Sequence, residues 1–371
     1  MKYYIIAGEA SGDLHGANLI KAIKEKDPQA NFRCWGGDLM QAQGAEIVKH
    51  YRDLAFMGFI EVVKNLPTIT KNIKFCKNDI LQYSPDVVIF IDYPGFNLRI
   101  ASFAKMQNFK TVYYISPQIW AWKQSRVHQI KRDIDKMLVI LPFEKEFYQR
   151  FDCQVDFVGH PLLDAIQNMN KLDESWRVKN NLSDKPIIAL LPGSRKQEIN
   201  TMLPIMLSVA NDFLEYQFVV AVAPGQELSF YQPFTEKYPV KLVQGETYAL
   251  LQNAHAALVT SGTATLETAL FNVPEVVCYK GSKISYEIAK RIIKVKYISL
   301  VNLIMDKMVV KELIQDELNP QNITKQLNEI LEPNKRTQLL ADYKLLKEKL
   351  GGRGASQRAA DKIVSFIAEG K

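Results

Sequence analysis

A single aspartate, Asp92, follows the apolar segment Asp86–Ile91 and precedes Tyr93-Pro94-Gly95, so it stands where a strand gives way to a turn. A carboxylate beside apolar side chains can have its pKa raised toward neutrality and take a proton from a hydroxyl group. The same residues fit an Asx turn, in which Asp92 does no more than bond its own backbone. Spacing alone favours the turn.

Two later segments, Leu191–Arg195 and Thr260–Glu267, have the residue types of phosphate-binding loops. Each follows an apolar run and opens a helical pattern, where free backbone N–H groups favour an anion. Arg195 adds a planar fork suited to phosphate oxygens, and Glu267 lies about one turn into its helix, within reach of ribose hydroxyls. Two such loops predict a nucleotide diphosphate site, made by Gly193, Ser194, Arg195, Ser261, Gly262, Thr263 and Glu267.

Two loops in the first third of the chain are open to more than one interpretation. The loop Gly8–Asp13 holds Glu9, Ser11, Gly12 and Asp13, and it fits either a ligand site or a tight turn with Asp13 capping a helix. The second loop holds Trp120 and Trp122, followed by basic residues. These rings fit a sugar or acyl site, and they fit packing between helices equally well.

The segment 57–77 combines an apolar stripe at helical spacing with lysines. It predicts either an interfacial helix pair that dips into anionic lipid or a core-facing stripe with solvated lysines. The apolar members that matter are Met57, Phe59, Val62, Val63 and Leu66, and the basic ones are Lys64, Lys71 and Lys74.

Short continuous apolar runs alternate with helical patterns along the chain, which predicts an α/β fold with parallel, doubly wound sheets. The turn Gly159–Pro161 and the polar stretch Asn168–Lys185 that follows predict a hinge near residues 160–165 between two such domains, whose strand-end loops should face a cleft. The tail 319–371 is predicted helical with a break at glycines 351, 352 and 354. The expected strands are Tyr3–Ala7, Asp86–Ile91, Thr111–Ile115, Lys136–Leu141, Val155–Val158, Ile187–Leu191, Phe218–Ala223 and Ala256–Val259.

Composition narrows the class of protein. The 371 residues are 47% hydrophobic and carry a net charge of +7, which suits an anionic ligand or surface and does not require nucleic acid. Four separated cysteines, without CxxC or Cys/His ligand spacing, predict buried thiols in a reducing compartment and no zinc site. No signal peptide or membrane span is expected, so we expect a cytoplasmic protein that can still lie on a membrane.

An ordered set of motifs resembles the lipid-A-disaccharide synthase family of inverting GT-B glycosyltransferases over nearly the whole chain. Single motifs are shared with other GT-B enzymes, but their combination and order are specific. They are Gly8–Asp13, Ser116–Trp122, Leu138–Tyr148, Phe157–Pro161, Leu191–Arg195 and Thr260–Glu267.

The resemblance implies a reaction and a place in the cell. The family transfers 2,3-diacylglucosamine from UDP-2,3-diacylglucosamine to 2,3-diacylglucosamine 1-phosphate, giving a β-1,6 disaccharide and UDP without a metal or other cofactor. It implies a peripheral enzyme at the cytoplasmic face of the inner membrane, with residues 57–77 as the acyl and membrane surface. The oligomeric state stays open.

The resemblance also implies roles for residues and domains. Asp92 occupies the candidate base position, Glu9 to Asp13 and the two tryptophans lie on the acceptor side, and Asn302 matches a polar position near the donor, with Val301 in place of the usual proline. It implies an acceptor and membrane-facing domain at residues 1–163, a UDP-sugar domain at 164–345, and a helix at 346–371 that returns to the first domain.

Two other functions stay open at this point. A non-hydrolysing UDP-sugar 2-epimerase would share the nucleotide loops but need neither acceptor nor acyl surface. A catalytically silent nucleotide- or lipid-binding protein could keep the same fold, because fold alone does not establish activity.

Overall fold

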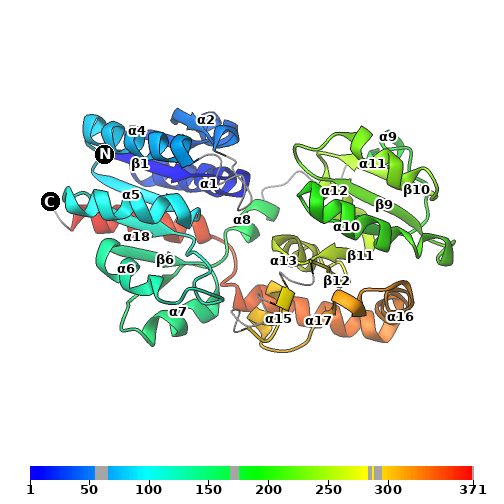
Figure 1. Cartoon of the computed structure of the whole chain (residues 1–371). Coiled ribbons are helices and arrows are strands. Elements are labelled where there is room, and N and C mark those ends of the chain that lie inside the picture. Colours follow the sequence, from blue (N-terminus) through cyan, green and yellow to red (C-terminus); the bar gives the residue numbers. More distant parts are fainter. Residues whose placement is uncertain (55–65, 168–174, 283–285, 288–294, 370–371) are drawn as a thin grey trace. The chain divides into compact units, whose positions relative to one another are not determined.

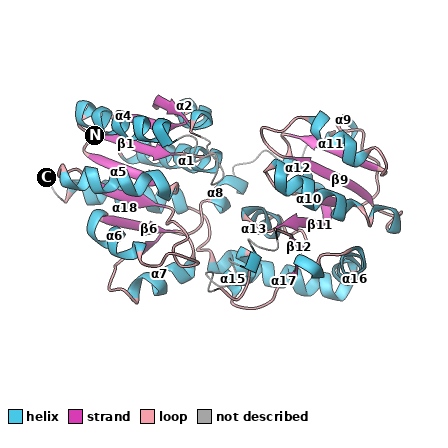
Figure 2. Ribbon diagram, viewed as in Figure 1, coloured by secondary structure: helices cyan, strands magenta, loops and turns pink. Residues whose placement is uncertain are grey.

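The computed structural model of the chain describes residues 1–54, 66–167, 175–282, 286–287 and 295–369. The chain forms two compact units, one made of residues 1–168 and 350–371 and the other of residues 169–349. It therefore changes unit after residues 168 and 349, where the sequence predicted changes after residues 163 and 345. Figures 1 and 2 show strands flanked by helices in each unit.

Unit 1 contains a seven-stranded parallel sheet in the order β3-β2-β1-β4-β5-β6-β7 within its described residues. The strands are β1 (Lys2–Ala7), β2 (Asn31–Gly36), β3 (Glu46–His50), β4 (Val87–Ile91), β5 (Lys110–Tyr114), β6 (Lys136–Val139) and β7 (Asp156–Phe157). The helices are α1 (Ala10–Lys26), α2 (Asp38–Ala42), α4 (Leu66–Tyr83), α5 (Pro94–Met106), α6 (Arg126–Asp133), α7 (Pro142–Gln149), α8 (Leu162–Gln167) and α18 (Ala355–Ala368), with a 3-10 turn at Tyr51–Asp53.

The central strands of unit 1 are apolar because helices cover both of their faces. All five residues of β4, Val-Val-Ile-Phe-Ile, are buried. The strand order reverses between β1 and β4, and right-handed crossovers then place α1 and α4 on opposite faces of the sheet. Helix α18 packs along α1, and α5 packs between α4 and α6.

Unit 2 contains a six-stranded parallel sheet in the order β10-β9-β8-β11-β12-β13 within its described residues. The strands are β8 (Ile187–Leu191), β9 (Gln217–Val222), β10 (Val240–Gln244), β11 (Ala254–Thr260), β12 (Glu275–Tyr279) and β13 (Lys311–Ile314). The helices are α9 (Trp176–Lys179), α10 (Lys196–Leu207), α11 (Leu228–Thr235), α12 (Thr247–Asn253), α13 (Thr263–Leu270), α15 (Leu300–Met305), α16 (Pro320–Leu331) and α17 (Pro333–Lys349), with 3-10 turns at Ala210–Asp212 and Gln315–Glu317.

In each sheet the strand order reverses once: successive strands are added toward one edge and then toward the other. The reversal lies between β1 and β4 in unit 1 and between β8 and β11 in unit 2. In doubly wound sheets the crossovers on the two sides leave a crevice outside the strand ends at this point, and ligands bind there. Glu9 and Asp92 follow β1 and β4, while Gly193 and Ser261 follow β8 and β11.

The last helix of unit 1 is fixed by the segment that follows β7. The Asp164 carboxylate accepts the N–H groups of Gly354 (2.7 Å) and Ser356 (2.9 Å) and so caps α18. Arg358 donates from Nε to the carbonyl oxygen of Val158 (2.8 Å). Gly159 has φ +84°, and a side chain there would collide with the Arg358 guanidinium. The motif Phe157–Pro161 therefore holds the C-terminal helix.

Among the strands that the structure describes, five lie outside the segments that the sequence predicted: β2, β3, β10, β12 and β13. Three of them, β3, β10 and β13, are sheet edges with lysines and half-buried side chains, so they lack a continuous apolar run. The expected α/β class with two doubly wound parallel sheets is confirmed. Among the described helices, none combines the length and apolar character that crossing a membrane requires.

Candidate active site

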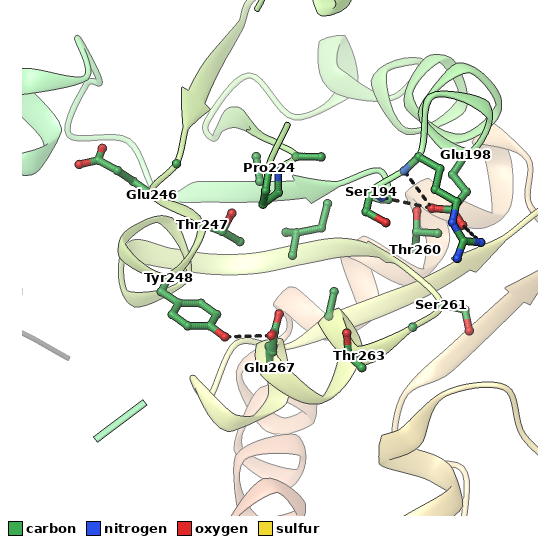
Figure 3. A pocket seen from close by; sticks show the side chains of 18 of the residues that line it. Ser194, Glu198, Pro224, Glu246, Thr247, Tyr248, Thr260, Ser261, Thr263 and Glu267 are labelled. Atoms are coloured by element: carbon green, nitrogen blue, oxygen red, sulfur yellow. Dashed lines mark hydrogen bonds and ion pairs between the residues drawn. The ribbon is translucent and has the colours of Figure 1, made fainter. Parts of the chain in front are cut away.

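A cavity of about 800 Å³ opens at the carboxyl ends of four neighbouring strands of unit 2 (Figure 3). The loops after β8, β9, β10 and β11 line it, so it lies beside the β8/β11 reversal. The predicted nucleotide loops meet here: Gly193, Ser194, Arg195, Ser261, Gly262, Thr263 and Glu267 all line the cavity.

The loop after β8 is held in place by Glu198, which is not among the residues predicted for the site. Gly193 has φ +109°, and a Cβ atom there would lie 2.7 Å from Glu198 Oε2. Glu198 Oε2 accepts the N–H groups of Ser194 (3.1 Å) and Arg195 (3.3 Å), and Arg195 Nη1 lies 3.6 Å from Glu198 Oε1. In this structure the carboxylate of Glu198 therefore occupies the donors that we had assigned to phosphate. Glu198 lies three residues after Arg195, at the spacing of a capping box, and this spacing is the feature of the sequence that could have indicated its role.

The second loop presents uncapped helix donors. Helix α13 begins at Thr263, and no side chain caps its N-terminus. The Thr260 hydroxyl lines the same cavity, is buried and has no hydrogen-bond partner. Ser261 instead donates its hydroxyl to the carbonyl oxygen of Ile298 (3.0 Å). The arrangement favours an anion at the start of α13.

Glu267 lies on the wall of this cavity, and Tyr248 points toward it (Figure 3). The Tyr248 hydroxyl donates to Glu267 Oε1 over 2.9 Å. Burial raises the pKa of Glu267, and the hydrogen bond from Tyr248 acts in the opposite direction. A carboxylate held in this way can accept hydrogen bonds from the hydroxyl groups of a sugar ring.

Asn302, which the resemblance places near the donor, is not among the residues that line the cavity. Its side chain is fully buried and fully used. Its Oδ1 accepts the N–H groups of Val309 (2.7 Å) and Val310 (3.0 Å), and its Nδ2 donates to Val310 O (2.8 Å) and Glu312 Oε1 (2.9 Å). Glu312 also accepts the Ile298 N–H, and Ile298 accepts the Ser261 hydroxyl. Asn302 therefore supports the cavity indirectly, through Glu312, Ile298 and Ser261.

In unit 1, Asp92 and Tyr93 form a strained turn between β4 and α5. Both have left-handed backbone conformations, with φ 45° and 48°, which are costly for residues other than glycine. Two side chains hold the turn, since Tyr113 Oη and Asn97 Nδ2 donate to the carbonyl oxygen of Asp92 over 2.6 and 2.7 Å. The sequence pattern did not identify either side chain, because each acts through the backbone.

The Asp92 carboxyl group has the electrostatics of a base. Burial raises the pKa of Asp92 to about 6, with a further rise from the nearby charge of Glu9, against a lowering by the Tyr93 N–H. Glu9 follows β1, the strand beside β4, with Ala7 in register with Ile91. The site therefore holds two carboxylates at one strand reversal, and Asp92 titrates near neutrality.

The other predicted residues of the first loop are mostly structural. Asp13 is buried and accepts the N–H groups of Gly37 (2.8 Å), Leu39 (3.0 Å) and Met40 (3.1 Å), so it caps α2 instead of facing a ligand. Gly12 is buried where α1 crosses β1, and a Cβ atom there would lie 3.1 Å from the Ala7 side chain. Ser11 and Glu9 are exposed.

The two tryptophans differ in environment. Trp120 is 8% exposed and packs edge-on against Phe143, with ring centroids 4.9 Å apart. Trp122 is 44% exposed. Near Trp120, burial raises the pKa of Glu144 to about 7, while its bonds to the Leu141 and Ile140 N–H groups lower it. Glu144 caps α7, which explains its place in the motif Leu138–Tyr148.

Most of the expected membrane stripe falls on residues that the structure does not describe. Met57, Phe59, Val62, Val63 and Lys64 lie outside the described residues. Helix α4 begins at Leu66, and its Lys71 and Lys74 side chains are exposed. Among the described residues, no three His, Cys, Asp or Glu side chains come together as a metal site would require.

Comparison with known proteins agrees with this architecture. A 2-epimerase of UDP-GlcNAc from Neisseria meningitidis, solved with UDP-GlcNAc bound, has a TM-score of 0.72 at 13% identity, covering 98% of this chain and 100% of its own. A calicheamicin glycosyltransferase has a TM-score of 0.60 at 15% identity, covering 99% and 98% of the two chains. At these identities the likeness concerns the fold, which is the GT-B arrangement of two parallel α/β domains.

Sequence relatives define the family. The lipid-A-disaccharide synthase of Syntrophus aciditrophicus is 40% identical over 371 residues, covering 98% of this chain and 97% of its own. The Lipid-A-disaccharide synthetase family profile matches residues 3–365. The chain belongs to the lipid-A-disaccharide synthase family of glycosyltransferases.

Proposed function

We propose that the protein transfers 2,3-diacylglucosamine from UDP-2,3-diacylglucosamine to the 6-hydroxyl of 2,3-diacylglucosamine 1-phosphate with inversion. The products are UDP and the β-1,6-linked disaccharide 1-phosphate. Family membership supplies the reaction class. The observation that carries the proposal is the Asp92 carboxyl group, held in a strained turn at the β1/β4 reversal with its pKa raised to about 6.

Asp92 acts as the general base in this proposal. The acceptor oxygen attacks the anomeric carbon as the bond from that carbon to the UDP oxygen breaks, and the bonding electron pair leaves with UDP. Asp92 takes the hydroxyl proton during the attack. A carboxyl group with a pKa near 6 is mostly ionised at pH 7 and is still basic enough to accept a proton.

The unit 2 cavity binds UDP in this proposal. The charge of the diphosphate is offset by Arg195, by the N-terminus of α13 and by the buried Thr260 hydroxyl. Glu267 accepts hydrogen bonds from the ribose hydroxyl groups. Glu198 must release the Ser194 and Arg195 donors when the diphosphate binds. These residues can stabilise the leaving UDP without a metal ion.

The membrane surface of the proposal includes α4. Lys71 and Lys74 are exposed on it, and Phe75 is 47% exposed beside them. Exposed lysines with an exposed aromatic ring suit an anionic bilayer surface. We place the protein at the cytoplasmic face of the inner membrane, where both acylated substrates would be reached.

The direct test is UDP release from UDP-2,3-diacylglucosamine in detergent micelles, with and without 2,3-diacylglucosamine 1-phosphate, and with EDTA present throughout. We expect release that requires the acceptor and survives chelation. Release without the acceptor would indicate hydrolysis of the donor and contradict the proposal. A complete lack of release with verified substrates would also contradict it and would favour the epimerase or the silent binding protein.

A further inference from the structure

The loop after β5 brings two cations to the strand edge that carries Asp92. Strand β5 lies beside β4, and the Asp92 N–H donates to the carbonyl oxygen of Tyr114, the last residue of β5 (3.4 Å). Residues 115–125 then connect β5 to α6, which begins at Arg126. Lys123 and Arg126 therefore start from the same edge as the base.

Both cations gather on one exposed aromatic ring. Lys123 Nζ lies 4.4 Å and the Arg126 guanidinium carbon 5.9 Å from the centroid of Trp122. The face of a tryptophan attracts cations and leaves their N–H donors free to bind something else. Lys123 adopts the left-handed conformation, φ 50°, so the backbone accepts local strain at this point.

Neither cation has a carboxylate partner in the described part of the chain, although their neighbours do. Arg132, on the same helix, pairs with Asp133 (2.7 Å), and Lys136 pairs with Asp156 (2.7 Å). Two like charges held on one ring repel each other, and an anion bound to both relieves that repulsion.

Arg126 is half-buried near the side chain that holds the Asp92 turn. Burial raises the pKa of Tyr113, whose hydroxyl donates to the Asp92 carbonyl oxygen, and the charge of Arg126 is the smallest of the influences on that pKa. The strand edge therefore carries opposite charges at its two ends, with the carboxylates of Glu9 and Asp92 just after β1 and β4 and the cations after β5. A ligand with a hydroxyl group and a phosphate has one preferred orientation on such an edge.

We propose that Trp122, Lys123 and Arg126 form the phosphate site for the acceptor, with Arg126 as the principal ligand and Trp122 as its platform. The site takes a phosphomonoester on the sugar and thereby directs the sugar hydroxyl toward Asp92. Arg126 suits this role because its planar fork binds two phosphate oxygens at once. The inference rests on the proposed function.

The test compares two acceptors, 2,3-diacylglucosamine with and without its 1-phosphate, at saturating donor. Arg126→Gln should lower kcat/KM for the phosphorylated acceptor by about ten- to a hundredfold, the range for a hydrogen bond to a charged group, and leave the other acceptor unchanged. Lys123→Gln should give the same pattern with a smaller loss, and Arg126→Lys should restore part of the rate. Arg150→Gln, an exposed arginine at the end of α7, is the matched control and should change neither.

Two results of this comparison would overturn the proposal. An equal loss with both acceptors would mean that Arg126 only supports the Asp92 turn. No loss with either acceptor would mean that the phosphate binds elsewhere.

A second arm separates the acceptor from the bilayer as the source of phosphate. Sedimentation with phosphatidylglycerol vesicles that contain no acceptor should be equal for the wild type and Arg126→Gln. Reduced sedimentation of Arg126→Gln would assign the cluster to bilayer headgroups and overturn the acceptor role.

A third arm distinguishes failure of this site from failure of the proposed function. If the wild type releases no UDP with either acceptor, ligand-observed NMR with glucosamine 1-phosphate and with glucosamine decides the matter. Binding that requires both the phosphate and Arg126 keeps the site, and equal binding of the two sugars, or none, overturns it.

Discussion

The two strand reversals of the molecule, β1/β4 in unit 1 and β8/β11 in unit 2, have the same topology and opposite chemistry. At β1/β4 the strand ends carry carboxylates, and Asp92 sits in a left-handed turn. At β8/β11 they carry Gly193, hydroxyl groups, Arg195 and the uncapped start of α13. Strand order thus determines where a site forms, and the few residues after each strand determine which step it can serve.

The difference matters because the proposed reaction needs both kinds of edge. A proton acceptor works best where burial and a like charge raise its pKa, as at Asp92 beside Glu9. A leaving diphosphate needs donors and positive charge that are oriented in advance.

The largest expected effect comes from Asp92→Asn, which removes the base and keeps the shape of the turn. We expect kcat to fall about 10²-fold or more, while UDP affinity stays unchanged, because the proposed UDP site lies in the other unit. Steady-state kinetics and calorimetry with UDP measure the two quantities. Full activity in this variant would remove Asp92 from the role of base, and a parallel loss of UDP affinity would break the comparison between the two edges.

The next effect concerns stability of the unit 2 edge. Asn302→Ala leaves the buried N–H groups of Val309 and Val310 without an acceptor. We expect a loss of roughly 2–3 kcal/mol, and a melting temperature lower by about 5–10 °C. Scanning calorimetry measures it, with the exposed Asn211→Ala as the control. An unchanged melting temperature together with weaker UDP binding would instead assign Asn302 to the donor.

A smaller effect is expected for Arg195→Ala, because Arg195 is 62% exposed and already paired with Glu198. UDP affinity should weaken by about tenfold, the value of one charge-assisted contact, and kcat with saturating donor should change less. Isothermal calorimetry measures the affinity, with Arg177→Ala as a control outside the cavity. Unchanged affinity would show that the diphosphate binds elsewhere.

The smallest effect tests the like charge at the unit 1 edge. Glu9→Gln removes a negative charge that raises the pKa of Asp92. The pKa of Asp92 should therefore fall, and the acid limb of the rate profile should move to lower pH with little change at pH 7. A shift to higher pH would mean that Glu9 does not act on Asp92 through its charge.

Much of the arrangement follows from the sequence because buried parallel strands leave a clear pattern. Tyr3–Ala7, Asp86–Ile91 and Ile187–Leu191 each correspond to a central strand, and the loop that follows each strand lies at one of the two reversals. Edge strands such as β3 and β10 mix lysines with apolar residues, and that mixture hides their period.

The positions of single polar side chains were harder to predict. Asp13 and Asn302 have the residue types of ligand-binding groups, but the side-chain oxygens of each accept hydrogen bonds from backbone N–H groups that the tertiary structure brings close. Tyr113 and Asn97 hold Asp92 through its carbonyl oxygen, so a pattern of side-chain types gives no indication of them. A local pattern cannot show which distant backbone group will meet a side chain.

The most direct test of the central claim is the pH dependence of kcat for the wild type and Asp92→Asn, measured with saturating donor and acceptor between pH 5 and pH 8. A base must be ionised to act, so the wild-type rate should fall about tenfold per pH unit below a pKa near 6. The residual rate of Asp92→Asn should show no such limb. A wild-type rate that is flat across this range, or a limb that persists in Asp92→Asn, would contradict the assignment of Asp92 as the base.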